Sequence, residues 1–195
     1  MRRVCYRVAM SLDGFIAGPN GEIDWISPDP SIDFASIYAG FDAALLGRRT
    51  YELTQQPGAP PWPPGWDVYV VSRTLRSAAN PAVRIIGAEV ESVVRGLRAS
   101  AGGDIWLFGG GDLAASLINM NLVDVIEVAI MPVILGAGVP FIASGRAARR
   151  CAARAWSNRP RGSSMCDITF HRHLAHEARY LSQLLRELPT GLSLL

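Results

Sequence analysis

A short apolar segment that runs directly into three glycines constrains the fold of this chain more than any other feature. Ile105–Phe108 has the composition of a buried strand, Gly109–Gly111 follow without a break, and Asp112–Asn119 has a helical pattern. Glycines let a ligand approach the backbone, and the free amides at a helix start favour a phosphate. We therefore expect a pyrophosphate-binding turn made by Gly109, Gly110, Gly111, Asp112 and Leu113. A tight turn that binds no ligand is the alternative.

Strands and helices alternate through residues 40–130. The strands are expected at 43–46, 67–71, 83–86, 105–108 and 123–130, and the helices at 50–54, 89–100 and 112–119. This alternation predicts an α/β domain with a largely parallel sheet. A strand over 4–10 precedes this region, and Ser31 is placed to cap a short helix that ends at Tyr38. Residues 154–156 and 164–170 are expected to form an antiparallel hairpin at the sheet edge.

Two further strands are expected to end in groups that suit phosphate. Gly47 is followed by Arg48, Arg49 and Thr50, and the strand ending at residue 71 is followed by Ser72 and Arg73. Guanidinium groups match phosphate oxygens, and ligands of open α/β sheets bind beyond the carboxyl ends of the strands. The two phosphate groups of one dinucleotide would explain all three segments. Surface arginines at a solvated helix start are the alternative.

The strand that follows the glycine turn argues against a Rossmann interpretation. Gly109, Gly111 and Ala114 match the spacing G-x-G-x-x-A, but the following strand ends at Ala129-Ile-Met131 without the acid that would bind the ribose. The turn therefore predicts a different kind of dinucleotide site.

Composition excludes several classes of protein. The 195 residues are 49% hydrophobic and 18% charged, which is typical of a folded domain. The net charge of +2 predicts no nucleic-acid partner, and the absence of both a long apolar run and a secretory signal predicts a cytoplasmic protein with no membrane contact. All 19 basic residues are arginines, so lysine Schiff-base chemistry is excluded.

The cysteines and histidines predict no metal site. Cys5, Cys151 and Cys166 are far apart in the sequence and form no C-x-x-C pair, so free thiols in a reducing compartment are expected. The three histidines lie close together near the end of the chain, at positions 171, 173 and 176. We interpret them as surface residues rather than as metal ligands.

Taken in order, five segments resemble the dihydrofolate reductase-like superfamily. They are Ser11–Gly21, Gly47–Glu52, Val71–Arg73, Phe108–Leu113 and Pro132–Pro140. The series is most similar to the C-terminal reductase domain of the bifunctional riboflavin-biosynthesis deaminase–reductase, and it spans residues 4 to about 172. The signature of a zinc deaminase is absent from this sequence. We therefore expect a stand-alone relative, with a reductase domain over 1–172 and a helical extension over 173–195.

The resemblance implies a mostly parallel central sheet, flanked by helices, with an antiparallel C-terminal hairpin. It also implies NADPH as cofactor. Arg48, Arg49, Thr50, Ser72 and Arg73 would hold the phosphates of the adenosine half, and the glycine turn would hold the pyrophosphate. Ala9, Ile16 and the segment 132–138 would lie near the nicotinamide. These arginines can bind the extra phosphate of NADPH, and no ribose-binding acid follows the glycine turn. NADPH is therefore expected to bind better than NADH.

The expected activity is the reduction of a small heterocycle, of the type of 5-amino-6-(5-phosphoribosylamino)uracil. A dihydrofolate or pteridine reductase and a non-catalytic nucleotide-binding protein are the alternatives. Asp33 and Asp13 are the candidate catalytic acids. For Asp33 the alternative is a favourable charge at a helix start, and for Asp13 it is a turn residue that accepts local backbone amides.

Two regions depart from the family pattern. Residues 57–66 contain five prolines together with Trp62 and Trp66, and are expected to form a surface loop whose tryptophans pack on the domain. The tail has apolar residues at helical spacing between 174 and 188. We expect this helix to support a homodimer, because an exposed apolar stripe usually finds a partner.

Overall fold

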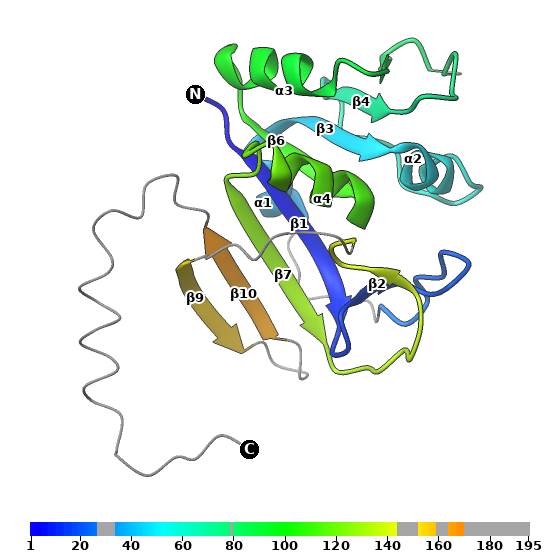
Figure 1. Cartoon of the computed structure of the whole chain (residues 1–195), viewed down its shortest axis with the longest axis vertical. Coiled ribbons are helices and arrows are strands. Elements are labelled where there is room, and N and C mark those ends of the chain that lie inside the picture. Colours follow the sequence, from blue (N-terminus) through cyan, green and yellow to red (C-terminus); the bar gives the residue numbers. More distant parts are fainter. Residues whose placement is uncertain (27–33, 79, 144–151, 159–163, 170–195) are drawn as a thin grey trace.

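Six parallel strands form the greater part of an eight-stranded sheet (Figure 1). The structure is a computed structural model that describes residues 1–26, 34–78, 80–143, 152–158 and 164–169. The strand order is β5-β4-β3-β6-β1-β7-β10-β9, and the pairs from β5 to β7 are all parallel. These strands are β5 (Val83–Ile86), β4 (Asp67–Val71), β3 (Phe41–Gly47), β6 (Asp104–Gly109), β1 (Val4–Ser11), β7 (Val125–Met131), β10 (Ser164–Thr169) and β9 (Ala152–Asn158).

Helices α3 (Val90–Ala99) and α4 (Gly111–Asn119) cover one face of the sheet, and α1 (Phe34–Tyr38) lies on the other (Figure 1). The face beneath α3 and α4 holds a closed apolar core, in which Tyr6, Leu45 and Leu107 are completely buried. Helix α2 (Arg48–Thr54) follows β3 directly and buries Tyr51. The parallel sheet is thus covered on both faces, as is usual for parallel sheets.

Aromatic rings line the sheet face opposite α3 and α4, and we call this face the aromatic face. It is formed by Phe41, Trp106 and Phe108 of the sheet together with Tyr38 of α1 and with Trp62 and Trp66. The Trp62 ring meets Phe108 at 5.2 Å between centroids, and Trp66 meets Trp106 at 6.1 Å. The proline-rich loop is therefore anchored by its two tryptophans, which confirms the expected packing role.

A second, two-stranded antiparallel sheet pairs β2 (Phe15–Ala17) with β8 (Val139–Pro140). The sequence analysis did not predict these strands, because two or three residues carry no periodic signal. A close approach holds them together, since a Cβ atom at Gly138 would overlap the carbonyl oxygen of Ala17. The β7–β8 connection is thereby held against the β1–β2 segment.

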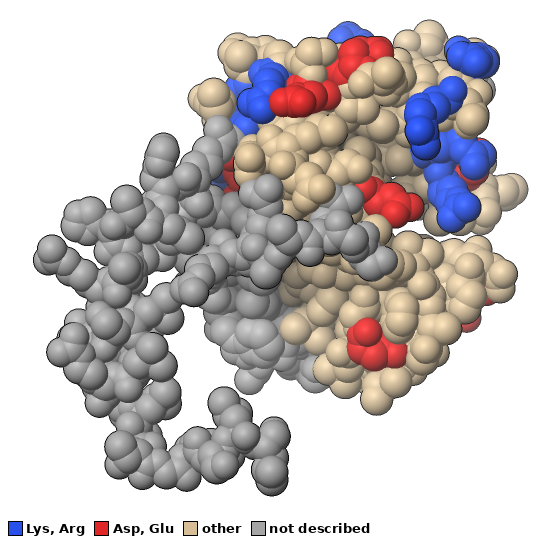
Figure 2. Space-filling model, viewed as in Figure 1, with Lys and Arg blue, Asp and Glu red and all other residues tan. Residues whose placement is uncertain are grey.

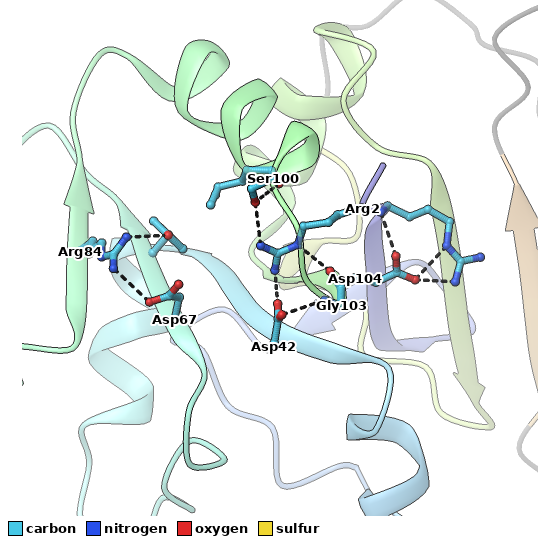
Figure 3. A network of polar contacts seen from close by, with 10 residues as sticks. Arg2, Asp42, Asp67, Arg84, Ser100, Gly103 and Asp104 are labelled. Carbon is cyan, nitrogen blue, oxygen red and sulfur yellow. Dashed lines mark hydrogen bonds and ion pairs between the residues drawn. The ribbon is translucent and has the colours of Figure 1, made fainter.

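Ion pairs join the amino ends of the parallel strands (Figure 3). Arg2 contacts the Asp42 carboxylate and donates to the Gly103 carbonyl at 2.6 Å, and Arg3 bonds Asp104 at 2.8 Å. Buried Arg98, at the end of α3, donates to Asp124 at 2.7 Å. This polar network lies at the edge of the sheet opposite the glycine turn.

The predicted fold class is confirmed. Strands β4 and β5 occupy the predicted residues, and the other predicted strands and helices of the central region differ by a few residues at their ends. The hairpin β9–β10 is antiparallel and adds to the edge of the sheet beside β7, as expected. Within the described residues, no helix is long and apolar enough to cross a membrane.

Some predicted features lie outside the described residues. They are Ser31 and Asp33 before α1, the histidines at 171, 173 and 176, the helix over 174–188, and the whole extension 173–195. The domain boundary at residue 172 and the homodimer accordingly stay predictions.

Candidate functional site

The carboxyl ends of the parallel strands bring the predicted phosphate-binding segments to one edge of the sheet. Gly47 at the end of β3 is in register with Val71 of β4, and Val71 with Ile86 of β5. On the other side of β3, Leu46 is in register with Gly109. Segments that are far apart in the sequence therefore end side by side, as the parallel arrangement requires.

The three glycines of the turn have different reasons to be glycine. Gly109 has a φ of +133°, which residues with a side chain rarely adopt, and its peptide bond to Gly110 is cis. A Cβ atom at Gly111 would overlap the carbonyl oxygen of Pro140 in β8. Gly110 has an ordinary φ of −94°, and a Cβ there would meet only the Thr50 hydroxyl at 3.5 Å. The fold itself thus explains two of the glycines but not Gly110.

Helix α4 begins at this turn with uncapped amides. Gly110 is the N-cap residue, and within the described part of the chain no side chain caps the helix start. The first backbone N–H groups of a helix have no partner within it and carry a partial positive charge. Asp112 is exposed and Leu113 is buried, so these residues offer a ligand their backbone amides.

The segment from Gly47 to Thr50 lies against the glycine turn. A Cβ atom at Gly47 would be 3.9 Å from both Gly109 O and Gly110 N, and the Thr50 hydroxyl is also beside Gly110. Arg48 pairs with Glu52 on the same helix at 2.8 Å, with both side chains largely exposed. An ion pair of this kind stabilises by only about 0.3–0.5 kcal/mol, so a phosphate can replace it. Arg49 is exposed at the start of α2.

A hollow of about 420 Å³ opens beyond the ends of β4 and β5. It is lined by Ser72, Arg73, Leu75, Arg76, Ile85, Gly87 and Ala88. Basic side chains gather along part of the surface of the molecule (Figure 2). Arg73 and Arg76 of the hollow are exposed, as are Arg48 and Arg49 at the start of α2. The sequence analysis missed Arg76. The sequence could have indicated Arg76, because it lies three residues after Arg73 in the loop that follows the same strand.

Ser72 has a structural task in this hollow. Its hydroxyl oxygen accepts hydrogen bonds from the backbone amides of Leu75 at 2.8 Å and Thr74 at 3.2 Å, which fixes the turn after β4. The same hydroxyl is also 3.5 Å from the Thr74 hydroxyl, where either group can be the donor. The two arginines beside it therefore carry most of the charge that this hollow presents.

Asp13 fastens the β1–β2 turn to the β7–β8 loop. Its carboxylate accepts hydrogen bonds from the Ser11 hydroxyl at 2.7 Å, the Gly136 amide at 2.7 Å and the Leu135 amide at 3.1 Å. The Ser11 hydroxyl and these amides lower the pKa of Asp13, so the carboxylate is ionised at neutral pH. These amides belong to the β7–β8 loop, whereas the alternative to catalysis expected amides of the turn that contains Asp13.

Ala9 and Ile16 lie at the same end of the sheet, on β1 and β2, and both are half-buried. The strands β2 and β8 adjoin the glycine turn through the packing of Pro140 on Gly111. The structure thus gathers the predicted cofactor residues along one edge. Asp33, a candidate catalytic acid, lies outside the described residues. Among the described residues, no three groups of metal-ligating type cluster together.

Comparisons with known proteins agree with this geometry. The chain is 34% identical over 181 residues to the uncharacterised protein YyaP of Bacillus subtilis (strain 168), covering 87% of this chain and 95% of that protein. A deaminase/5-amino-6-(5-phosphoribosylamino)uracil reductase from Thermotoga maritima shares the fold, with a TM-score of 0.66 and 16% identity, over 86% of this chain and 56% of that one.

Dihydrofolate reductase from Enterococcus faecalis, solved with NADP(H), shares the fold with a TM-score of 0.60 and 16% identity, over 88% of this chain and 97% of that one. The fold is therefore dihydrofolate reductase-like. The family model of the RibD C-terminal domain matches residues 2–162, which is most of the sequence. The chain belongs to the RibD C-terminal domain family.

Proposed function

We propose that the protein is an NADPH-dependent reductase of a small heterocyclic substrate, of the riboflavin-pathway type. The observation that carries this proposal is Gly110. It is a glycine that the fold does not require, at the uncapped start of a helix and at the carboxyl edge of a parallel sheet. A glycine in that place allows a ligand oxyanion to reach the backbone amides.

The described residues fit NADPH along the whole edge. The amides that begin α4 suit the pyrophosphate, with Arg48 and Arg49 beside them. The hollow lined by Arg73 and Arg76 suits the adenosine end, because two guanidinium groups there match a phosphate on the ribose. Ala9 and Ile16 would contact the nicotinamide end.

When bound, the nicotinamide supplies a hydride to an electrophilic carbon of the substrate. The chain has to orient both molecules, exclude water and deliver a proton to the heteroatom that the hydride leaves negative. Asp13 is ionised and holds its loop through three hydrogen bonds, so it is placed to shape the site rather than to donate the proton. We retain Asp33 as the proposed proton donor.

The family and the Thermotoga maritima protein support a pyrimidine substrate, and the fold shared with dihydrofolate reductase supports a pterin as the second candidate. Loss of NADPH absorbance at 340 nm in the presence of 5-amino-6-(5-phosphoribosylamino)uracil is the expected result. Turnover of dihydrofolate alone would favour the second candidate. Tight NADPH binding without turnover of either compound would contradict the enzymatic proposal and favour a nucleotide-binding protein.

We expect NADPH to bind about ten- to a thousandfold more tightly than NADH, because one or two charge-assisted hydrogen bonds from Arg73 and Arg76 depend on the extra phosphate. Arg73→Glu should narrow this preference, mainly by weakening NADPH, and Arg76→Glu should act in the same direction. Fluorescence titration with both cofactors measures the effect.

Arg95→Glu is the matched control, because Arg95 is an exposed arginine of α3 that does not line the hollow. It should leave both dissociation constants unchanged. Equal affinities for NADPH and NADH in the wild-type protein would show that the arginines of the hollow simply face water.

A further inference from the structure

A charged pair lies beside the aromatic face, on the next two strands of the sheet. Arg7 of β1 and Glu127 of β7 are in register on adjacent strands. Arg7 Nη2 donates to Glu127 Oε1 at 2.9 Å, Nε contacts the other carboxylate oxygen, and Nη1 donates to the Ile37 carbonyl of α1 at 3.2 Å. The two groups form a side-on ion pair that α1 holds in place.

Aromatic rings flank the pair on the Arg7 side, and Asp167 of β10 is in register with Glu127 on the other side. The Arg7 guanidinium lies over the Phe41 ring at 5.0 Å, and Trp106 donates its indole N–H to the Arg7 carbonyl at 3.2 Å. Cys5 precedes Arg7 on the same face of β1, and burial raises the pKa of its thiol to about 12. Charges in such a place lose hydration, and an apolar pair of similar volume is often at least as stable. Stability is therefore a weak explanation for the presence of this pair.

The pair is partly exposed. The Arg7 and Glu127 side chains keep 27% and 20% of their exposure, whereas the core on the opposite face is closed. Ala9 and Ala129, the next paired residues on the same face, lie one step closer to the carboxyl edge where the nicotinamide is proposed to bind. A ring that reaches the nicotinamide on this face would extend over the ion pair.

Arg7 and Glu127 both keep hydrogen-bonding groups that the described residues do not use. Each terminal nitrogen of Arg7 uses one N–H within the described structure and keeps a second, and the carboxylate of Glu127 keeps lone pairs beyond those facing Arg7. The pair thus presents donors and acceptors side by side. A ring edge with adjacent C=O and N–H groups is complementary to that arrangement.

We propose that Arg7 and Glu127 determine substrate specificity by binding the C=O and N–H edge of a uracil-type ring. Arg7 donates to the carbonyl oxygen and Glu127 accepts from the ring N–H. This inference rests on the proposed function for the place of the nicotinamide, and it adds the residues that recognise the substrate. It also gives a role to a charged pair that lies next to the rings of Phe41 and Trp106.

The test compares two probes that differ only at the ring nitrogens. 5,6-Diaminouracil has both ring N–H groups, and 1,3-dimethyl-5,6-diaminouracil has neither. Binding is followed by quenching of tryptophan fluorescence, because Trp106 and Trp66 lie on this face. The wild-type protein should bind the parent compound about ten- to a hundredfold more tightly than the methylated one, as expected for hydrogen bonds to charged groups.

The double variant R7M/E127L replaces the pair by apolar residues, which should preserve the fold and the affinity for NADPH. It should bind the two probes equally. R3M/D104N, which removes an ion pair at the opposite edge of the sheet, is the control and should discriminate as the wild type does. If R7M/E127L does not fold, Glu127→Gln should lose most of the discrimination, because a neutral amide binds the ring N–H less strongly.

Titration with NADPH in the same samples separates this inference from the proposed function. A protein that discriminates the probes through Glu127 but does not bind NADPH would refute the reductase and leave the recognition pair standing. Full discrimination in R7M/E127L, or no preference between the probes in the wild type, would refute the recognition pair whatever the result for NADPH.

Discussion

Replacing Gly110 by valine is expected to weaken NADPH binding at least a hundredfold while the protein stays folded. The backbone at Gly110 has an ordinary φ, and the nearest atom to an added Cβ is the Thr50 hydroxyl at 3.5 Å, so the fold can accept a side chain. The same side chain would stand where a pyrophosphate has to meet the amides of α4. A loss of about 2.7 kcal/mol in binding free energy corresponds to that factor. Calorimetric titration with NADPH measures it.

Gly111→Ala is the matched control, because it alters the same turn but is expected to lower stability. Its Cβ would overlap the Pro140 carbonyl, so we expect a loss of stability of at least about 1–3 kcal/mol as β8 is displaced. Thermal unfolding should therefore separate the two variants, with a clear decrease in Tm for Gly111→Ala and little change for Gly110→Val. Unchanged NADPH affinity in a folded Gly110→Val protein would mean that the glycine turn binds no pyrophosphate.

The second large effect is expected at the opposite edge of the sheet, where Asp124→Ala should lower the free energy of unfolding by about 3–5 kcal/mol. Arg98 is 4% exposed and donates to Asp124 at 2.7 Å, and the Asp124 carboxylate also accepts from the Val4 amide at 2.9 Å. Removing the acid leaves a buried guanidinium without its counter-charge. Such a loss is a large part of the roughly 5–15 kcal/mol that stabilises a domain.

The exposed pair Arg95–Glu91 supplies the comparison. Both side chains are more than half exposed and lie four residues apart on α3, so Glu91→Ala should cost only about 0.3–0.5 kcal/mol. Urea unfolding of the two variants gives both values. Equal losses would show that burial does not strengthen the Arg98–Asp124 pair, contrary to the physical reason given for it.

We thus expect variants at one edge of the sheet to change binding and variants at the other edge to change stability. Cofactor variants at the carboxyl edge of the sheet should change affinity with little change in stability. Variants of the ion-pair network at the amino edge (Figure 3) should do the reverse. A parallel sheet makes this division possible, because all of its strands present their carboxyl ends at one edge and their amino ends at the other.

The sequence by itself determined the parallel sheet and the edge at which the site lies. Apolar segments of four to eight residues separated by helical patterns fix the type of each element, and parallel strands bring Gly47, Ser72 and Gly109 to one edge without further information. Local chemistry also distinguished the glycine turn, because glycine and arginine next to a helix start act through the backbone and charge nearby.

The tertiary structure decided what depends on contacts between distant segments. The strands β2 and β8 exist because Gly138 and Gly111 allow close backbone contacts, and nothing in two or three residues signals such contacts. Asp13 holds a loop that lies more than a hundred residues away in the sequence. Arg7 and Glu127 are likewise 120 residues apart, and only the register of β1 with β7 makes them a pair. Local patterns encode secondary structure, whereas partners across the sheet are set by the packing of the whole chain.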